Sequence, residues 1–244
     1  MKTLLYGAHA GDLSPEVQRF PSLELVHANP DVVVCYGGDG TLLSAELEWP
    51  GVPKLPIRNS RRGHRCMPHP IPDILARLAA NELYHNEFVK LCCEVRHDDG
   101  TPMTEPLTAM NEINVHMGRI NSAVRFKLWI DEEPFEEGLE IVGDGLVVST
   151  PFGSTAYFHQ ITRGVFHTGL GIAFKYTTHP VNHLVVRDTL TVRVLITRGP
   201  AVAAYDNAPE FLGLQAGNEL IIRKHSHPAL ILTWDPLPSS SAQF

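Results

Sequence analysis

Cysteine is scarce in this sequence, and no apolar run approaches the length needed to cross a membrane. The four cysteines lack the Cys-x-x-Cys spacing of zinc or redox sites, so we interpret them as reduced thiols of a cytoplasmic protein. Only a short apolar run separates the early lysine from Gly7, which is less than a signal peptide requires. The sequence therefore predicts a cytoplasmic location and no membrane partner.

Charge is also low, because charged residues make up 19% of the 244 residues and hydrophobic residues 43%. These proportions exclude a disordered chain and a coiled coil. The formal net charge of -7 argues against a nucleic-acid partner held by bulk electrostatics. The thirteen histidines show no zinc-ligand spacing with cysteines or carboxylates, so we predict no metal site built by the protein alone.

Two hydrophobic patterns follow one another along the chain. Up to about residue 86, short β-like runs alternate with helical ones, including a buried strand over 31–36 and a helix over 71–83. Beyond about residue 88 the pattern has period two, with β runs over 89–95, 124–130, 146–149, 183–196, 201–205, 219–223 and 229–234. This predicts an α/β domain over 1–86 and a β-rich domain over 87–228, with a final strand and tail over 229–244 that could pack back on the first domain.

The first chemical motif is the run Gly37-Gly38-Asp39-Gly40-Thr41, directly after the valine-rich strand. Ligand loops of α/β proteins stand at the carboxyl ends of strands. Glycines let backbone N–H groups approach a phosphate, and the carboxylate can take a proton from an attacking hydroxyl. A tight turn would explain Gly-Asp-Gly alone, but the full run after such a strand favours phosphoryl transfer.

A second glycine-framed aspartate opens a longer segment. The segment runs from Gly143-Asp144-Gly145 to Ser149-Thr150-Pro151-Phe152-Gly153-Ser154-Thr155-Ala156-Tyr157. Its hydroxyls suit a polar ligand, and a loop whose side chains cap their own backbone is an equally good interpretation. Upstream, Asn111-Glu112 offers donors and acceptors for a ribose diol, although Glu112 could equally be a solvated strand residue.

With these three segments in this order, the chain resembles the NAD kinase family, whose members carry GGDGT, an Asn-Glu pair and GDG-x-x-x-STP-x-GSTAY. The resemblance extends from the second strand through the β domain. It implies the fold of that family, an α/β amino-terminal domain followed by an all-β carboxyl-terminal domain. It also implies ATP-dependent phosphorylation of the adenosine ribose 2′-hydroxyl of NAD to give NADP, with polyphosphate as the donor in some relatives.

The resemblance implies roles for residues of the first motif. Asp39 would be the catalytic base or the acid that orients the hydroxyl. Gly38, Gly40 and Thr41 would meet the phosphates of ATP, with a divalent ion, magnesium, neutralising the oxygens. It further implies that the chain forms a homodimer or homotetramer.

The other two segments would bind the dinucleotide. Asn111 and Glu112 would hold the diphosphate or ribose of NAD, and Asp144 would accept from the nicotinamide amide. The adenine end would be held by Thr155, Ala156 and Tyr157, with the tyrosine ring offering a stacking face.

Three further positions carry weaker signals. Arg61 and Arg62 follow a strand-like run and could grip the phosphates of ATP or polyphosphate, or form a solvated basic loop. Asp206 resembles a late aspartate of the family near the nicotinamide ribose, and a hairpin-turn aspartate is about as good an interpretation.

Two departures from the family pattern keep other functions open. Phe152 stands where the family has Thr or Ser, and Thr162-Arg163 stands where a glycine pair is usual. These favour, as one alternative, a nucleotide-binding protein with weak or lost kinase activity. A lipid kinase that shares GGDGT is a second alternative, and the long second segment argues against it.

Overall fold

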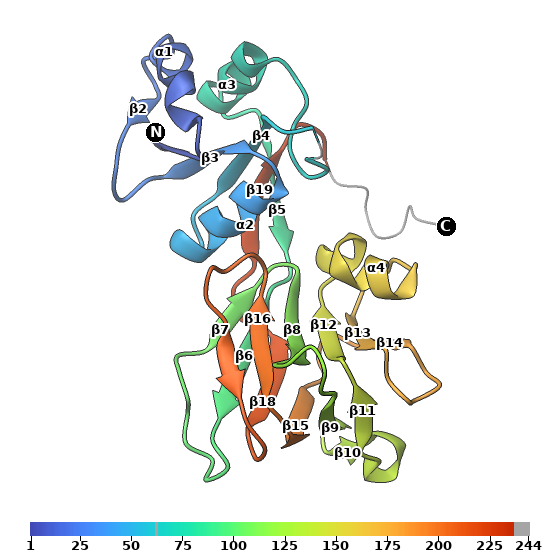
Figure 1. Ribbon diagram of the computed structural model, residues 1–244. Coiled ribbons are helices and arrows are strands. Elements are labelled where there is room, and N and C mark those ends of the chain that lie inside the picture. The colour runs from blue at the N-terminus through green and yellow to red at the C-terminus, as the bar shows by residue number, and fades with distance from the viewer. Residues whose placement is uncertain (62, 237–244) are drawn as a thin grey trace. The chain divides into compact units, whose positions relative to one another are not determined.

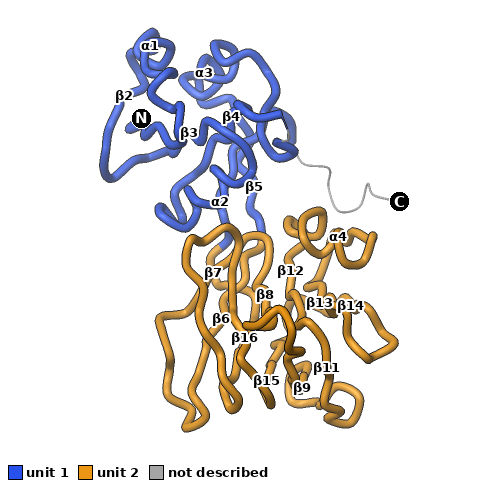
Figure 2. Tube along the Cα trace, in the orientation of Figure 1, with its two compact units in different colours: residues 1–88, 228–244 blue, residues 89–227 orange. Residues whose placement is uncertain are grey.

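The computed structural model describes residues 1–61 and 63–236 and divides into two compact units, coloured separately in Figure 2. The first unit joins Met1–Phe88 to the segment that begins at Pro228, and the second unit is Val89–His227. The sequence-based boundaries stand at 86/87 and 228/229, within two residues of these limits.

The first unit is a six-stranded sheet with order β2-β1-β3-β4-β19-β5, in which β19 pairs parallel to β4 and antiparallel to β5. Its strands are β1 (Lys2–Tyr6), β2 (Glu24–Leu25), β3 (Val32–Gly37), β4 (Lys54–Arg58), β5 (Tyr84–Phe88) and β19 (Ala229–Thr233). Its helices are η1 (Ala10–Leu13), α1 (Ser14–Val17), α2 (Asp39–Glu48) and α3 (Ile71–Ala79).

The core of this unit explains why β3 is a continuous valine run. A parallel strand covered on both faces is apolar at every position, and Val32, Val33 and Val34 are all buried. On one face, Ile74 and Leu75 of α3 complete the core. The strand therefore delivers the glycine pair of the first motif to a fixed point at its carboxyl end.

The second unit contains two antiparallel sheets. One has the order β10-β9-β15-β18-β6-β7, with β11 also paired to β9, and the other β14-β13-β12-β8-β16-β17. The first sheet comprises β6 (Leu91–Arg96), β7 (Leu107–Ala109), β9 (Val124–Ile130), β10 (Glu133–Pro134), β11 (Ile141–Gly143), β15 (Val192–Arg198) and β18 (Glu219–Lys224). The second comprises β8 (Glu112–Met117), β12 (Gly145–Ser149), β13 (Leu170–Lys175), β14 (His183–Val186), β16 (Ala201–Tyr205) and β17 (Leu212–Leu214).

One hydrophobic cluster draws side chains from both sheets, as in a β-sandwich. Phe126 and Val194 come from the first sheet, and Ile113, Val148 and Ile172 come from the second. Short helices interrupt the strands at η2 (Phe135–Gly138), η3 (Gly153–Thr155) and α4 (Tyr157–Thr162), and α4 is visible beside β13 in Figure 1. The predicted fold class, α/β followed by β, is confirmed.

The single β run expected over 183–196 is wrong, because the chain forms two strands there. A turn closed by the Leu190 N–H and the Arg187 carbonyl, 3.1 Å apart, separates β14 from β15. β14 pairs with β13 in one sheet, whereas β15 pairs with β9 and β18 in the other. A sequence window shows continuous β-type residues and does not show that the chain changes sheets. No helix in the described part of the chain has the length and apolarity to span a membrane.

Candidate functional site

In the first unit, Asp39 begins helix α2, immediately after the N-cap residue Gly38. Its half-buried carboxylate accepts hydrogen bonds from the backbone N–H groups of Arg65 at 2.9 Å and His64 at 3.1 Å. The thiol of Cys66 lies 3.7 Å from the same carboxylate. Asp39 therefore holds the loop between β4 and α3 against the start of α2, where the helix dipole also favours a negative charge.

The surroundings of Asp39 shift the pKa values of its neighbours. Burial, followed by the charge and hydrogen bond of Asp39, raises the pKa of the Cys66 thiol to about 12. Burial lowers the pKa of Arg65, against the opposing effect of the Asp39 charge. The thiol is therefore protonated and unreactive at neutral pH.

Gly37, the first glycine of the pair before Asp39, packs closely against the side chain of Thr41. A Cβ on Gly37 would stand 2.2 Å from the Thr41 hydroxyl oxygen, so only glycine permits this approach. Gly40 and Arg61 are exposed, and Thr41 is half-buried. Arg62 lies outside the described residues.

In the second unit, Asp206 and the Asn111-Glu112 pair lie together. Asp206 directly follows β16, whose last residue pairs with Ile113 near the start of β8. The Asp206 carboxylate accepts hydrogen bonds from the backbone N–H groups of Met110 and Asn111, both at 2.7 Å, and of Glu112 at 3.3 Å. The aspartate thus fixes the backbone of the pair by charge-assisted hydrogen bonds.

Glu112 is a strongly perturbed acid of this cluster. Its side chain is nearly buried, with 8% exposure, and within the described residues its Oε2 atom has no hydrogen-bond partner. Burial, followed by the charge of Asp206, raises the pKa of Glu112 to about 8. A buried, incompletely paired acid of this kind is suited to bind a ligand hydroxyl.

The hydroxyls of the Ser149–Ser154 loop face inward. Thr150 donates to the Met110 carbonyl and accepts from the Gly153 N–H at 3.0 Å, and Ser149 donates to the Asn111 carbonyl at 3.2 Å. Ser154 donates to the carbonyls of its own loop and of residue 166. These side chains cap backbone groups, as the polar-loop interpretation expects, and they hold the loop on the Asn111 backbone.

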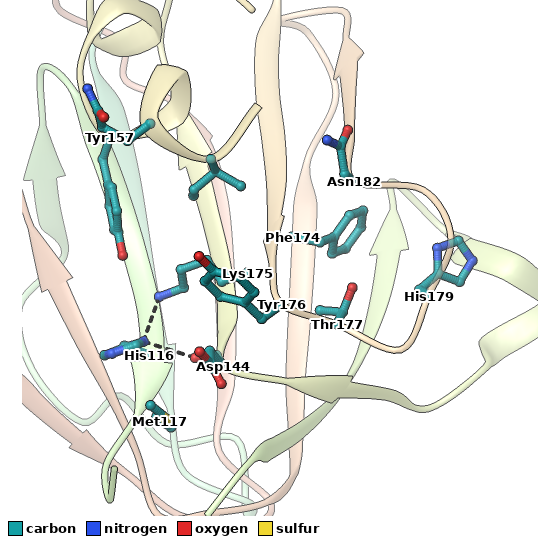
Figure 3. Close-up of a pocket in the computed structure, with 12 residues that line it drawn as sticks. His116, Met117, Asp144, Tyr157, Phe174, Lys175, Tyr176, Thr177, His179 and Asn182 are labelled. Atoms are coloured by element: carbon teal, nitrogen blue, oxygen red, sulfur yellow. Dashed lines mark hydrogen bonds between the residues drawn. The ribbon is translucent and has the colours of Figure 1, made fainter. Parts of the chain in front are cut away.

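A cavity of about 620 Å³ opens in the second unit (Figure 3). Its walls come from β8, the Asp144 turn, α4, and β13 with the loop that follows it. The lining residues are His116, Met117, Asp144, Tyr157, Gln160, Ile161, Phe174, Lys175, Tyr176, Thr177, His179 and Asn182. Two of the predicted site residues, Asp144 and Tyr157, therefore share one cavity.

The glycines around Asp144 bring its turn close to neighbouring chain. A Cβ on Gly145, which has a φ of +126°, would stand 2.1 Å from the Val115 carbonyl oxygen. A Cβ on Gly143 would stand 2.7 Å from the Thr177 backbone. The two glycines thus let β8, β12 and the chain after β13 converge on the cavity.

Lys175, at the end of β13, is a cavity residue that the sequence motifs did not indicate. It is buried, and its Nζ atom donates to Asn114 Oδ1 at 2.6 Å and lies 3.0 Å from His116 Nδ1. The same nitrogen stands 5.7 Å from the centre of the Tyr157 ring. Burial lowers the pKa of Lys175 to about 7, against the opposing charge of Asp144. The only sequence signal was a lysine closing the otherwise apolar run Leu170–Lys175.

Electrostatics also links the cavity to the Glu112 cluster. Burial, followed by the charges of Asp144 and Glu112, raises the pKa of Tyr157. Thr155 is exposed and Ala156 half-buried, and neither lines the cavity. The second unit therefore brings together Asn111, Glu112 and Asp206, and beside them Asp144 and Tyr157.

The departures at Phe152 and Arg163 leave the cavity open. Phe152 is 7% exposed and is not a lining residue, so its ring packs inside the protein. Arg163 caps α4 in the left-handed conformation, with φ 61°, a position that favours glycine because it has no Cβ. The Arg163 side chain is exposed, so it occupies no space in the cavity.

The fold is that of solved dinucleotide kinases. The structure of a yeast NADH kinase complexed with NADH matches with a TM-score of 0.77 and 17% identity, covering 88% of this chain and 67% of that one. An NAD kinase from Archaeoglobus fulgidus, in complex with ATP, matches with a TM-score of 0.76 and 19% identity, covering 95% and 92%. At these identities the likeness shows the fold.

Sequence comparisons point the same way. The model of the ATP-NAD kinase C-terminal domain matches residues 110–166, which include Asn111, Glu112, Asp144 and Tyr157. An NAD kinase of Koribacter versatilis is 29% identical over 216 residues, covering 84% of this chain and 73% of the relative. An NAD kinase of Neisseria gonorrhoeae is 26% identical over 215 residues, covering 83% and 69%. Over most of its length the chain is therefore similar to NAD kinases.

Proposed function

We propose that the protein is an NAD kinase, which transfers the γ-phosphoryl group of ATP to the adenosine ribose 2′-hydroxyl of NAD. The observation that carries this proposal is the clamping of Asn111 and Glu112 by Asp206 beside the cavity lined by Asp144 and Tyr157. Three separate sequence segments supply these groups, and in all three the chain resembles the family.

The dinucleotide binds to the second unit in this proposal. Asn111 and Glu112 hydrogen-bond the ribose or diphosphate, and the Asp144 carboxylate accepts from the nicotinamide carboxamide. Tyr157 offers its ring to a base, with Thr155 and Ala156 at the adenine end. Asp206 acts mainly through the backbone that it holds, because its carboxylate is engaged by the N–H groups of residues 110–112.

The phosphate donor binds to the first unit. Gly38, Gly40 and Thr41 meet the phosphates with backbone N–H groups and a hydroxyl, and the positive charge of Arg61 and Arg62 attracts them. Residues 1–61 and 63–236 contain no group of three or more metal-ligating side chains. A site with few protein ligands suits magnesium, because this ion keeps several of its waters and binds mainly through nucleotide phosphates. Bound there, the ion would neutralise charge on the phosphate oxygens.

Asp39 is the residue that we assign to the chemical step. Its carboxylate orients the 2′-hydroxyl and accepts its proton as the oxygen attacks the γ-phosphorus. Catalysis of phosphoryl transfer depends chiefly on positioning and charge neutralisation. A carboxylate fixed by two backbone N–H groups can supply the positioning.

Finer features of the proposal follow from the family resemblance. Polyphosphate is a second candidate donor, because it presents the same anionic oxygens to Arg61 and Arg62. A homodimer or homotetramer is the expected assembly, and the cytoplasm, whose reducing conditions suit the unpaired cysteines, the expected location.

The decisive experiment compares the wild-type protein with Asp39→Asn in an assay of NADP formation from NAD, ATP and magnesium. We expect the variant to lose at least about a hundredfold in kcat, as removal of a general base does, while its Kd for NAD changes little. Asp12→Asn, an exposed acid of the same unit, should retain full turnover.

Three outcomes would contradict parts of the proposal. Turnover of Asp39→Asn within about threefold of wild type would remove Asp39 from the chemical step. NAD binding without turnover by the wild-type protein would instead favour a nucleotide-binding protein. Activity confined to a lipid alcohol would favour a lipid kinase.

A further inference from the structure

A buried lysine and an aspartate face the same cavity. Lys175 is 3% exposed, and its cavity also holds Asp144, the residue to which we assign the nicotinamide carboxamide. Two neutral groups on β8, Asn114 Oδ1 and His116 Nδ1, hold the Lys175 Nζ atom at 2.6 and 3.0 Å. In Figure 3 this nitrogen lies between Tyr157 and His116, with Asp144 next to the histidine.

The geometry gives Lys175 no partner carboxylate within ion-pair distance in the described part of the chain, since its two hydrogen-bond partners are an amide and an imidazole. The Lys175 Nζ atom is therefore placed beside uncharged groups at the wall of a cavity large enough for a heterocycle. Burial without a carboxylate partner does not stabilise the protein, because desolvating an ammonium group is costly. Packing alone therefore does not explain a lysine at this position.

We propose that Lys175 sets the redox preference of the dinucleotide site, by offsetting the negative charge of Asp144 and so favouring NADH over NAD⁺. This inference rests on the proposed function, which places the nicotinamide in this cavity. The oxidised ring carries a positive charge and the reduced ring is neutral, whereas both present the same carboxamide to Asp144. Only the charge balance of the cavity separates the two forms.

Two titratable neighbours of Lys175, His116 and Tyr157, stay uncharged near neutral pH. Burial, then the charge of Lys175, lowers the pKa of His116, which keeps that imidazole neutral. Burial raises the pKa of Tyr157, so its hydroxyl stays protonated. Asp144, which precedes β12, supplies the negative charge, and the remaining lining residues of the β13 loop include Tyr176 and His179. Loss of the positive charge on Lys175 therefore leaves the negative charge of Asp144 uncompensated.

The same reasoning predicts how the preference varies with pH. The pKa of Lys175 is lowered to about 7, so its ammonium form prevails below that pH and its neutral amine above it. The ratio of the Kd for NAD⁺ to the Kd for NADH should therefore fall as the pH rises through this range. Between about pH 6 and about pH 8.5 we expect a fall of about tenfold.

The test measures the Kd of the full-length protein for NAD⁺ and NADH by isothermal titration calorimetry at both pH values. Lys175→Met should lower the ratio at pH 6 by about tenfold and abolish its pH dependence. Lys175→Arg, which keeps its charge throughout, should hold the high ratio at both pH values. Lys224→Met removes an exposed lysine of the same unit, paired with Asp188, and should change nothing. Circular dichroism checks that each variant is folded.

The inference is overturned if Lys175→Met leaves the ratio within about twofold of wild type, or if the wild-type ratio is the same at both pH values. If both dinucleotides bind and NADP forms while the ratio ignores Lys175, the inference fails and the proposed function stands. If neither dinucleotide binds and no NADP forms, the proposed function fails, and the inference with it.

Discussion

The carboxylate of Asp206 accepts a hydrogen bond from the backbone N–H of Asn111 at 2.7 Å, across 95 positions of the sequence. Removing this acceptor in Asp206→Ala leaves the N–H groups of Met110 and Asn111 partly buried without their partner. We expect the free energy of unfolding to fall by about 2 kcal/mol, measured by urea denaturation. The Kd for NAD should rise in parallel, because the Asn111-Glu112 backbone loses its support.

The control for this variant is Asp188→Ala, which removes a surface acid that pairs with Lys224 in the same unit. A surface ion pair contributes little, so its unfolding free energy should change by less than about 1 kcal/mol. Equal losses for the two variants would show that the clamp on residues 110–112 adds no particular stability.

The raised pKa of Glu112 should make the stability of the protein depend on pH. The folded protein holds the Glu112 proton up to about pH 8, whereas the unfolded chain releases it near the ordinary value of 4.5. Between these values unfolding releases a proton, so the wild-type unfolding free energy should fall as pH rises, with a slope of up to about 1.4 kcal/mol per pH unit. Glu112→Gln should remove this slope, and it should exceed wild type in stability above pH 8.

Glu94→Gln is a matched control of opposite sign. Hydrogen bonds from Arg223 and Arg96 lower the pKa of Glu94, so its contribution to stability is present above about pH 4.5 and is lost at lower pH. This variant should therefore be slightly less stable than wild type at neutral pH. Urea titrations across the pH range test both variants. If Glu112→Gln keeps the wild-type slope, the pH dependence of stability does not come from Glu112.

A methyl group at Gly153 should disrupt the loop that rests on Asn111. The Cβ of an alanine would stand 2.2 Å from the Asn111 carbonyl oxygen, a backbone atom that cannot move away cheaply. Gly153→Ala should lower the unfolding free energy by about 3 kcal/mol or prevent folding. In Gly213→Ala, a Cβ would meet nothing within 4 Å, so this control should change stability by no more than about 0.5 kcal/mol. Thermal unfolding of the two variants makes the comparison.

The arginines after β4 should act on ATP more than on NAD. The double variant Arg61→Ala with Arg62→Ala should raise the KM for ATP about tenfold, because charge-assisted contacts to phosphate are lost, and leave the KM for NAD nearly unchanged. Arg19→Ala removes an exposed arginine of the same unit and should alter neither constant. Equal increases in both Michaelis constants would show that these arginines do not bind the donor.

The local hydrophobic patterns of the sequence were enough to predict the fold class and many of its strands. The valine run of β3 and the alternation over Val124–Ile130 reflect burial on both faces and on one face of a sheet, respectively, and both strands form where the pattern placed them. The single strand predicted over 183–196 was wrong because β14 and β15 are both rich in β-type residues, although they pair in different sheets. The helix α4 was missed, since a helix of six residues offers too short a window for periodicity.

By itself, the sequence determined which residues were candidates, through glycine-framed acids in a fixed order. Only the tertiary structure decided what each does, because hydrogen bonds and burial depend on partners far along the chain. It assigned the Ser149 and Thr150 hydroxyls to backbone carbonyls and gave Asp206 the role of a clamp. It also brought Lys175, which belongs to no motif, to the cavity of Asp144, where burial lowers the pKa of this lysine to about 7.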